Sequence, residues 1–308
     1  MNRPTFDPGL TQQYSGTLRR SINRDGSFNV RRRGGSWRHL HPYLTLLNMN
    51  WTEFFLLVFA AYFAVNLIFA AGYFALGPDA LQGAALAEGG HRFWTDFFFS
   101  AHTLTTVGYG NIAPASVGAN VLSVIEALAG LLGVALATGL LFGRFSRPSA
   151  RIAFSERLLV APYQDRSSVQ FRILNLRPNV LMEIQAHMIL MTVEGAPGAL
   201  ARRYQPLKLE REDLYFLALS WTIVHPIEED SPLFGKTRED LQRLQAEFVV
   251  MIKAYDDTFA QSVHARYSYR YDEMVWQARF QPAFEMDGAG NMILNVDRVS
   301  SFTAGAGI

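Results

Sequence analysis

The chain has 308 residues, of which 49% are hydrophobic and 18% charged, with a formal net charge of +1 and no cysteine. The lack of cysteine excludes a disulfide framework, a thiolate metal site and a cysteine nucleophile, and the balanced charge argues against a nucleic-acid binder. Apolar residues gather in the first half, which indicates two unlike domains.

The first fifty residues predict an arm and a short helix. Residues 1–36 contain Arg, Gly and Ser without an apolar period, which indicates a mobile or loosely docked N-terminal arm. Residues 37–50 mix apolar and polar side chains just before a long apolar run, which predicts an interfacial helix along the inner membrane surface. We expect no cleavable signal peptide, because the first apolar run starts at residue 51.

Two apolar segments, residues 51–76 and 117–142, predict transmembrane helices. As helices each would reach about 39 Å, enough to cross a hydrocarbon core of about 30 Å with some tilt. Each contains one ionisable residue, Glu53 and Glu126. An acid inside a span is costly and tends to be paired or to face water. Glu126 therefore either braces the loop between the spans or adds negative potential to a cavity, and we favour bracing.

Between the spans lie an aromatic segment and a glycine-containing pentapeptide. Residues 93–105 are too few to span and predict a re-entrant pore helix, whose C-terminal end would attract a cation. The pentapeptide is Thr106-Val107-Gly108-Tyr109-Gly110. Its two glycines allow backbone conformations closed to other residues, so that successive carbonyls can point the same way. A dehydrated cation is the natural partner of such a row, and we interpret it as a selectivity filter.

The arginine distribution predicts the orientation. Residues 1–50 contain eight arginines and the segment after the second span adds three, whereas residues 77–116 contain only Arg92. The positive-inside rule then puts both termini in the cytoplasm and the pentapeptide near the outer face of a cell inner (plasma) membrane.

After residue 148 the pattern changes to short strands. Alternating or strand-like runs separated by turn residues predict an antiparallel β-sandwich with one short helix at 237–244; the runs are residues 169–173, 182–193, 215–223, 247–255 and 274–284. No glycine-rich dinucleotide fingerprint follows the second span. The expected organisation is an N-terminal arm (1–36), an interfacial helix (37–50), a transmembrane pore domain (51–147) and a cytoplasmic β-sandwich (148–308).

These features together resemble the inward-rectifier potassium channels, especially the bacterial branch, from about residue 37 to residue 284. Further matching stretches are Arg144-Phe-Ser-Arg-Pro148, Asn175-Leu-Arg177, Trp221-Thr-Ile-Val-His-Pro226 and Asp272-Glu-Met-Val-Trp276. The resemblance implies a two-helix membrane pore domain, with two transmembrane helices plus a re-entrant pore helix, followed by a cytoplasmic immunoglobulin-like β-sandwich.

The resemblance also implies roles for individual residues. Carbonyls of Thr106, Val107, Gly108 and Tyr109 would coordinate K⁺, with the Thr106 hydroxyl at the innermost site, and Gly110 would turn the backbone outward. Phe142 would form the gate at the helix-bundle crossing, and Val134 occupies the cavity position where strong rectifiers have an acid. The remaining sets are the cytoplasmic pore acids Glu183, Asp213 and Asp257 and the lipid-headgroup arginines Arg144, Arg147, Arg151 and Arg177.

The sequence departs from the family in places. Ser149 and Ala150 replace family lysines beside the membrane, which leaves the effect of phosphoinositides open. His102 and Ile112 stand where eukaryotic members have a paired acid and arginine behind the filter.

We therefore expect a potassium-selective channel of inward-rectifier type, gated at the inner helix bundle and cytoplasmic domain and modulated by anionic lipids. One chain supplies one filter loop, so four copies around an axis are needed. The expected partners are K⁺ as permeant ion, anionic lipids and three further copies, with no cofactor. The alternatives are a ligand-gated two-span potassium channel with a small-molecule-binding cytoplasmic domain, and a non-conducting membrane-anchored binding protein. An enzyme is not expected, since no nucleophile–base or metal-ligand spacing is present.

Overall fold

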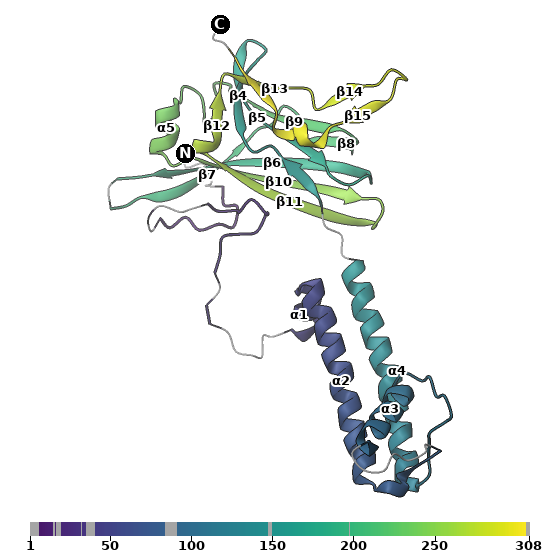
Figure 1. Cartoon of the computed structure of the whole chain (residues 1–308). Helices are drawn as coiled ribbons and strands as arrows, with labels where there is room; N and C mark the ends of the chain where they lie inside the picture. The colour runs from purple at the N-terminus through teal and green to yellow at the C-terminus, as the bar shows by residue number, and fades with distance from the viewer. Residues whose placement is uncertain are drawn as a thin grey trace. The chain divides into compact units, whose positions relative to one another are not determined.

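The computed structural model describes residues 6–14, 16, 20–31, 33–34, 41–83, 91–146, 150–196 and 198–305. The chain divides into two compact units (Figure 1): Arg33–Arg147, which is helical, and Met1–Arg32 with Pro148–Ile308, which is rich in strands. Each unit is described by itself. Part of the expected interfacial helix, residues 37–40, and the predicted headgroup residue Arg147 lie outside the described residues.

The helical unit contains two helices that are long and apolar enough to cross a membrane, α2 (Trp51–Ala75) and α4 (Val117–Phe145). Both begin where a side chain caps the first turn. Asn50 and Glu53 form a capping box before α2, and the hydroxyl of Ser116 accepts the Ala119 backbone N–H before α4. These positions confirm the two predicted spans, although α4 continues beyond residue 142.

Shorter elements surround the two long helices. α1 (Pro42–Asn48) precedes α2, and its proline occupies the first helical position, where no backbone N–H is required. α3 (Arg92–Leu104) packs against both long helices near their connected ends (Figure 1) and corresponds to the predicted pore helix at 93–105. The connection also contains η2 (Pro78–Ala80) and a small antiparallel pair, β1 (Leu81–Gln82) with β2 (Ala113–Pro114).

The strand-rich unit is a sandwich of two five-stranded sheets, which confirms the predicted fold class. One sheet has the order β11-β10-β6-β7 with β8 also paired to β6, and the other has the order β12-β4-β5-β3 with β9 paired to β5. Within these sheets only β12 with β4 is parallel among the described strands. The strands are β3 (Ile152–Phe154), β4 (Leu158–Tyr163), β5 (Arg166–Asn175), β6 (Leu181–Glu194), β7 (Ala201–Leu207), β8 (Asp213–Leu217), β9 (Ser220–Pro226), β10 (Glu247–Asp256), β11 (Gln261–Arg270) and β12 (Met274–Trp276).

The remaining elements lie around this sandwich. The predicted helix at 237–244 is α5 (Arg238–Arg243), capped by the Thr237 hydroxyl, which accepts the Asp240 backbone N–H. The others are η3 (Tyr271–Glu273), β13 (Ala278–Phe280), β14 (Phe284–Met286), β15 (Met292–Leu294), η4 (Val296–Ser300) and β16 (Phe302–Ala304).

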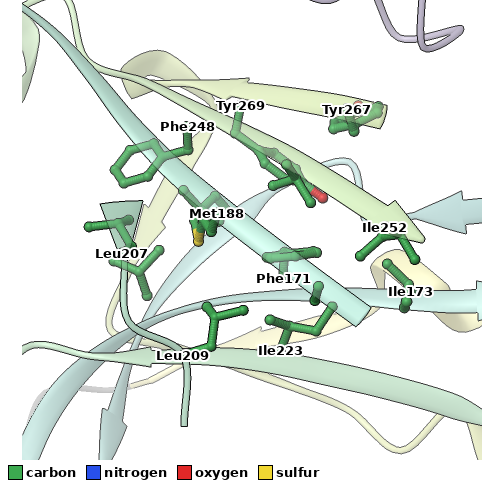
Figure 2. Close-up of a cluster of buried hydrophobic side chains, with 14 of the residues drawn as sticks. Phe171, Ile173, Met188, Leu207, Leu209, Ile223, Phe248, Ile252, Tyr267 and Tyr269 are labelled. Atoms are coloured by element: carbon green, nitrogen blue, oxygen red, sulfur yellow. The ribbon is translucent and has the colours of Figure 1, made fainter. Parts of the chain in front are cut away.

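The hydrophobic core lies between the two sheets (Figure 2). Phe171 and Ile173 alternate along β5 and are fully buried, with Met188 of β6 and Ile252 of β10 opposite them. Burying each such side chain contributes about 1.5–3 kcal/mol. Because alternate residues of a strand point to the same face, the period of two predicted at 169–173 determines which face of β5 packs in the core.

The outer face of β5 is covered by the C-terminal segment. Arg172, which points away from the core, donates a hydrogen bond to the Gln281 carbonyl at 2.6 Å, and its guanidinium lies 4.5 Å from the Phe280 ring centre. Burial lowers the pKa of Arg172 to about 10. A buried cation needs such acceptors, and this contact holds the C-terminal segment on the sheet.

Part of the N-terminal arm is packed on the sandwich, which differs from the mobile or loosely docked arm expected from composition. Ile22 is buried, and its carbonyl accepts a hydrogen bond from the Ser268 hydroxyl at 2.9 Å. The backbone N–H and hydroxyl of Ser21 both donate to Glu247 at 2.8 Å. Arg20 and Arg24 bind Glu273. The contacts come from strands distant in sequence, so composition alone could not predict them.

A buried histidine joins β9 to the loop that follows it. The Nδ1 of His225 lies 2.6 Å from the Lys208 carbonyl, and its Nε2 lies 2.8 Å from the Ser231 hydroxyl. Since a carbonyl only accepts, Nδ1 donates, and a neutral ring then accepts the serine proton at Nε2. Burial lowers the pKa of His225. The Lys208 carbonyl and the nearby carboxylates of Asp230 and Glu228 favour the charged form and oppose this shift, but burial has the larger effect.

We expect His225 to make the protein less stable in mild acid. The unfolded chain takes up this proton around the ordinary value of 6.5, whereas the folded chain resists it. The stabilisation is therefore present above about pH 6.5 and is lost as the pH falls, by at most about 1.4 kcal/mol per pH unit. Thermal unfolding of the detergent-solubilised protein at several pH values should show this slope. His225→Gln should flatten it, and His264→Gln, at an exposed position on β11, should not; equal slopes in all three proteins would contradict the assignment.

Candidate functional site

The loop after α3 has an unusual backbone. Thr106, Gly108 and Gly110 have positive φ angles of 59°, 53° and 81°, whereas Val107 and Tyr109 do not have positive φ. Alternation of left-handed and ordinary conformations turns successive peptide planes to one side, so that their carbonyls can form a row. A left-handed threonine costs about 1–2 kcal/mol, and such strain persists where the surrounding structure enforces it.

The end of α3 holds this loop. The His102 carbonyl accepts the backbone N–H of Val107 at 2.9 Å and that of Gly108 at 3.3 Å, and the Thr103 carbonyl accepts the Thr106 N–H at 3.0 Å. The His102 ring also meets the Tyr109 ring edge to face, with centres 4.6 Å apart. These hydrogen bonds are donated by the backbone N–H groups of the loop to carbonyls of α3. The carbonyls of the loop itself are left available for another partner.

α4 approaches the last turn of α3 closely at Gly130. A Cβ on Gly130 would collide with the Leu104 carbonyl oxygen and lie 2.9 Å from its carbonyl carbon. Leu104 immediately precedes Thr105 and the pentapeptide. A glycine within a long apolar helix is a signal of close helix approach, but the partner of Gly130 in α3 could not be predicted from the sequence.

We expect Gly130→Ala to impair the loop. The added methyl group would push α4 from α3 at an overpacking cost of about 1–3 kcal/mol. In reconstituted protein this should lower cation flux and reduce discrimination between K⁺ and Na⁺. Gly133→Ala is the matched control, because a Cβ there meets nothing within 4 Å among the described residues. Equal flux and selectivity in the two variants would show that the contact does not matter.

Glu126 lies behind the loop and is bonded inside the chain. It is 0% exposed, accepts a 2.7 Å hydrogen bond from the Tyr73 hydroxyl of α2, and contacts the Ser100 hydroxyl of α3. Ser100 also contacts Asn66 of α2. This geometry supports bracing rather than a cavity charge. The cost of an acid in a membrane span pointed to Glu126 but not to its partners, although Asn66 and Tyr73 lie seven residues apart on one face of α2.

The side chains in the C-terminal half of α4 are largely exposed to solvent in the single chain. Val134 and Phe142 are 63% and 72% exposed. Next to Phe142, Gly143 lies against α1, since a Cβ there would be 3.1 Å from the Tyr43 hydroxyl and 3.3 Å from Leu47. α1 therefore contacts α4 beside the predicted gate residue.

Arg144 is held inside the helical unit. Its guanidinium donates to the Leu46 carbonyl at 2.5 Å and to the Met49 carbonyl at 2.7 Å. It also lies 4.5 Å from the Trp51 ring centre and 4.7 Å from that of Phe54. Arg144 thus ties the α1–α2 connection to the end of α4, and these contacts compete with the lipid contact predicted for it.

Arg151 and Arg177 are brought together by strand pairing. Ile152 of β3 pairs with Asn175 of β5, and the Leu176 N–H donates to the Arg151 carbonyl at 2.8 Å. Arg151 is exposed, and the Arg177 guanidinium lies 5.9 Å from the Phe259 ring centre. The two arginines therefore flank one edge of the sandwich.

The three predicted pore acids lie near one end of the β6–β8–β10 part of the sheet. Glu183 has a φ of 48° where the register of β6 against β10 shifts. Asp213 pairs with Gln185, two residues from Glu183, and Asp257 follows Asp256, which pairs with Leu181. All three acids are exposed.

Both units of the chain match known protein families. Residues 54–147 match the family described as ion channel, and residues 152–304 match the inward rectifier potassium channel C-terminal domain. The chain is 36% identical to the inward rectifier potassium channel Kirbac3.1 of Paramagnetospirillum magnetotacticum over 91% of this chain and 94% of that protein. The chain belongs to the inward rectifier potassium channel family.

Vertebrate members of the family are more distant. Human ATP-sensitive inward rectifier potassium channel 14 is 28% identical over 93% of this chain and 71% of its own length. Chicken ATP-sensitive inward rectifier potassium channel 12 is 31% identical over 67% of this chain and 50% of its own length. The family is one of transmembrane ion-transport proteins rather than enzymes, and the fold expected of this inward rectifier potassium channel, a membrane pore domain followed by a β-sandwich, is confirmed.

Proposed function

We propose that this channel conducts K⁺ as a homotetramer, through a filter formed by the carbonyls of Thr106, Val107, Gly108 and Tyr109. The observation that supports this most directly is the alternating backbone of residues 106–110, anchored on its α3 side. One such loop is one wall of a coordination cage, and four copies around an axis supply the oxygen shell that replaces the ion's water. The uncovered apolar faces of α2 and α4 are available to lipid and to neighbouring copies.

Gating is proposed at Phe142. Four such rings near the inner end of α4 would form an apolar constriction that closes by dewetting. The contact of Gly143 with α1, and the bonds of Arg144 to the α1–α2 connection, support a coupling between α1 and the spacing of these rings. Val134 offers no negative charge to the cavity, so block by Mg²⁺ or polyamines at that level should be weak.

Anionic lipids are proposed as partners at the inner membrane surface. Arg147, Arg151 and Arg177 are the proposed headgroup ligands, and the pairing of β3 with β5 supports joint action of the last two. Because Arg144 binds carbonyls within the chain, we assign it a positioning role. Glu183, Asp213 and Asp257 would line a cytoplasmic pore and concentrate cations. This requires both termini to be cytoplasmic in a plasma membrane, which the arginine distribution supports.

The test is uptake of rubidium, which substitutes for K⁺, by liposomes that contain the purified protein. We expect uptake that external Ba²⁺ blocks and that changes when anionic lipid is added. Uptake no greater than in empty liposomes, across lipid compositions, would overturn the proposed function.

A further inference from the structure

Behind the filter loop, three helices share a buried chain of polar groups. Glu126 of α4, Ser100 of α3 and Asn66 of α2 are each 0% exposed within one copy of the chain. Tyr73, Glu126, Ser100, Asn66 and Tyr62 are joined in that order by hydrogen-bond contacts. These side chains are out of reach of bulk water, and each direct hydrogen bond between them takes its proton from one of the two groups that it joins.

The orientation of Asn66 is fixed by its backbone partner. Its side-chain Nδ2 donates to the Tyr62 carbonyl at 2.8 Å. If the amide were reversed, two acceptor oxygens would face each other at that distance. Asn66 therefore presents its Oδ1 to Ser100, whose hydroxyl oxygen lies 3.0 Å away. Since Oδ1 has no proton, a hydrogen bond between these two atoms is donated by Ser100.

Ser100 has one proton and faces more than one acceptor. Its hydroxyl lies near Oδ1 and the backbone carbonyl of Asn66, at 3.0 and 3.3 Å, and also contacts Oε1 of Glu126. If the proton points to Asn66, the contact with Glu126 needs a second proton. Tyr73 cannot supply it, since its hydroxyl donates to the other oxygen, Oε2, at 2.7 Å. The remaining source is the carboxyl group of Glu126.

We propose that Glu126 is a neutral carboxylic acid that donates to Ser100 and so positions the pore helix against both membrane-spanning helices. Each member then donates to the next, from Tyr73 through Glu126, Ser100 and Asn66 to the Tyr62 carbonyl, so that each of these four contacts has its own proton. A neutral acid adds no charge to the pore. Its effect on conduction rests on the proposed function, but its protonation does not.

A second buried carboxyl group, Asp96 on α3, must be distinguished from Glu126 in any test. Asp96 is buried one turn before Ser100, and its Oδ2 lies 3.9 Å from Nε of Arg92. His102 lies on the same helix beyond Ser100, and Tyr73 is the ionisable group that faces Glu126 from α2.

The direct experiment is infrared difference spectroscopy of the intact channel in lipid at neutral pH. We expect the carbonyl band of a protonated carboxyl group in the wild-type protein, absent from Glu126→Gln and retained in Asp96→Asn. Loss of the band in Asp96→Asn alone, or carboxylate bands for Glu126, would overturn the proposal. The measurement does not require conduction, so it stands even if the proposed function fails.

A flux experiment tests the positioning role. In Glu126→Gln the amide can accept from Tyr73 and donate to Ser100, as the neutral acid does, so K⁺ flux and selectivity should stay within about twofold of wild type. Glu126→Leu can do neither and should lose selectivity. If Glu126→Leu does not assemble, Ser100→Ala, which removes the central link, takes its place. Loss of flux in Glu126→Gln, with a conducting wild type, would show that the negative charge is needed and would overturn the proposal.

Discussion

Replacing Gly108 by alanine should abolish selective K⁺ flux while leaving the protein folded. Gly108 has a φ of +53°, and a Cβ there would meet nothing within 4 Å among the described residues, so the backbone angle is the cause of the effect. Alanine in this conformation costs about 1–2 kcal/mol, which in the four copies of the proposed tetramer becomes about 4–8 kcal/mol. At about 1.4 kcal/mol for each factor of ten, the flux should fall by at least about 100-fold.

The control for Gly108→Ala is Gly290→Ala. Gly290 also has a positive φ, +86°, and open space around its Cβ position, but it lies in the turn between β14 and β15. This variant has a comparable backbone cost and should conduct normally. Rubidium uptake by liposomes, with tetramer yield measured for each variant, gives the comparison. Selective uptake in Gly108→Ala near the wild-type level would show that the conformation of residue 108 is not needed.

Replacing Phe142 by alanine should raise basal K⁺ flux, by about an order of magnitude if the ring closes the pore by dewetting. The side chain is exposed and directly precedes Gly143, which lies against α1, and its removal would widen and wet the constriction. Selectivity should be unchanged, since residues 106–110 follow Leu104, which contacts α4 at Gly130, twelve residues before Phe142. The measurement is initial uptake under conditions where the wild-type channel is mostly closed.

Phe145→Ala is the matched control for Phe142. The Phe145 ring packs against Trp51 of the same chain, with centres 4.9 Å apart, and therefore faces α2. Its loss should lower stability without raising flux. If Phe142→Ala conducts like wild type, or if both variants raise flux equally, the gate lies elsewhere.

The membrane elements could be predicted because their signals are long and local. Two runs of apolar residues predicted α2 and α4, and the aromatic segment between them predicted α3, each to within a few residues. The polar contacts between these helices could not be predicted in the same way. Glu126 was identified by its cost in a membrane, but Tyr73 and Ser100 are ordinary residues whose importance comes from facing it.

The sandwich was predicted as a class but not strand by strand. The run predicted at 215–223 is two strands, β8 and β9, that pair with different sheets. β7 was missed because its sequence, with two arginines and a proline, has no apolar period; its pairing with β6 makes it a strand. The run predicted at 274–284 as one strand begins three short strands instead, β12, β13 and β14. Each of them pairs with a different partner, β4, β16 and β15 respectively, and these partners could not be predicted from the local sequence.

The most direct test of the account is the reversal potential of the purified channel in a planar bilayer with K⁺ on one side and Na⁺ on the other. If four loops of residues 106–110 replace the hydration shell of K⁺, the reversal potential should lie far from zero, with the sign that opposes the flow of K⁺ down its gradient, and Ba²⁺ should block the current. A reversal potential near zero in these solutions, which means that Na⁺ passes as readily as K⁺, would contradict it.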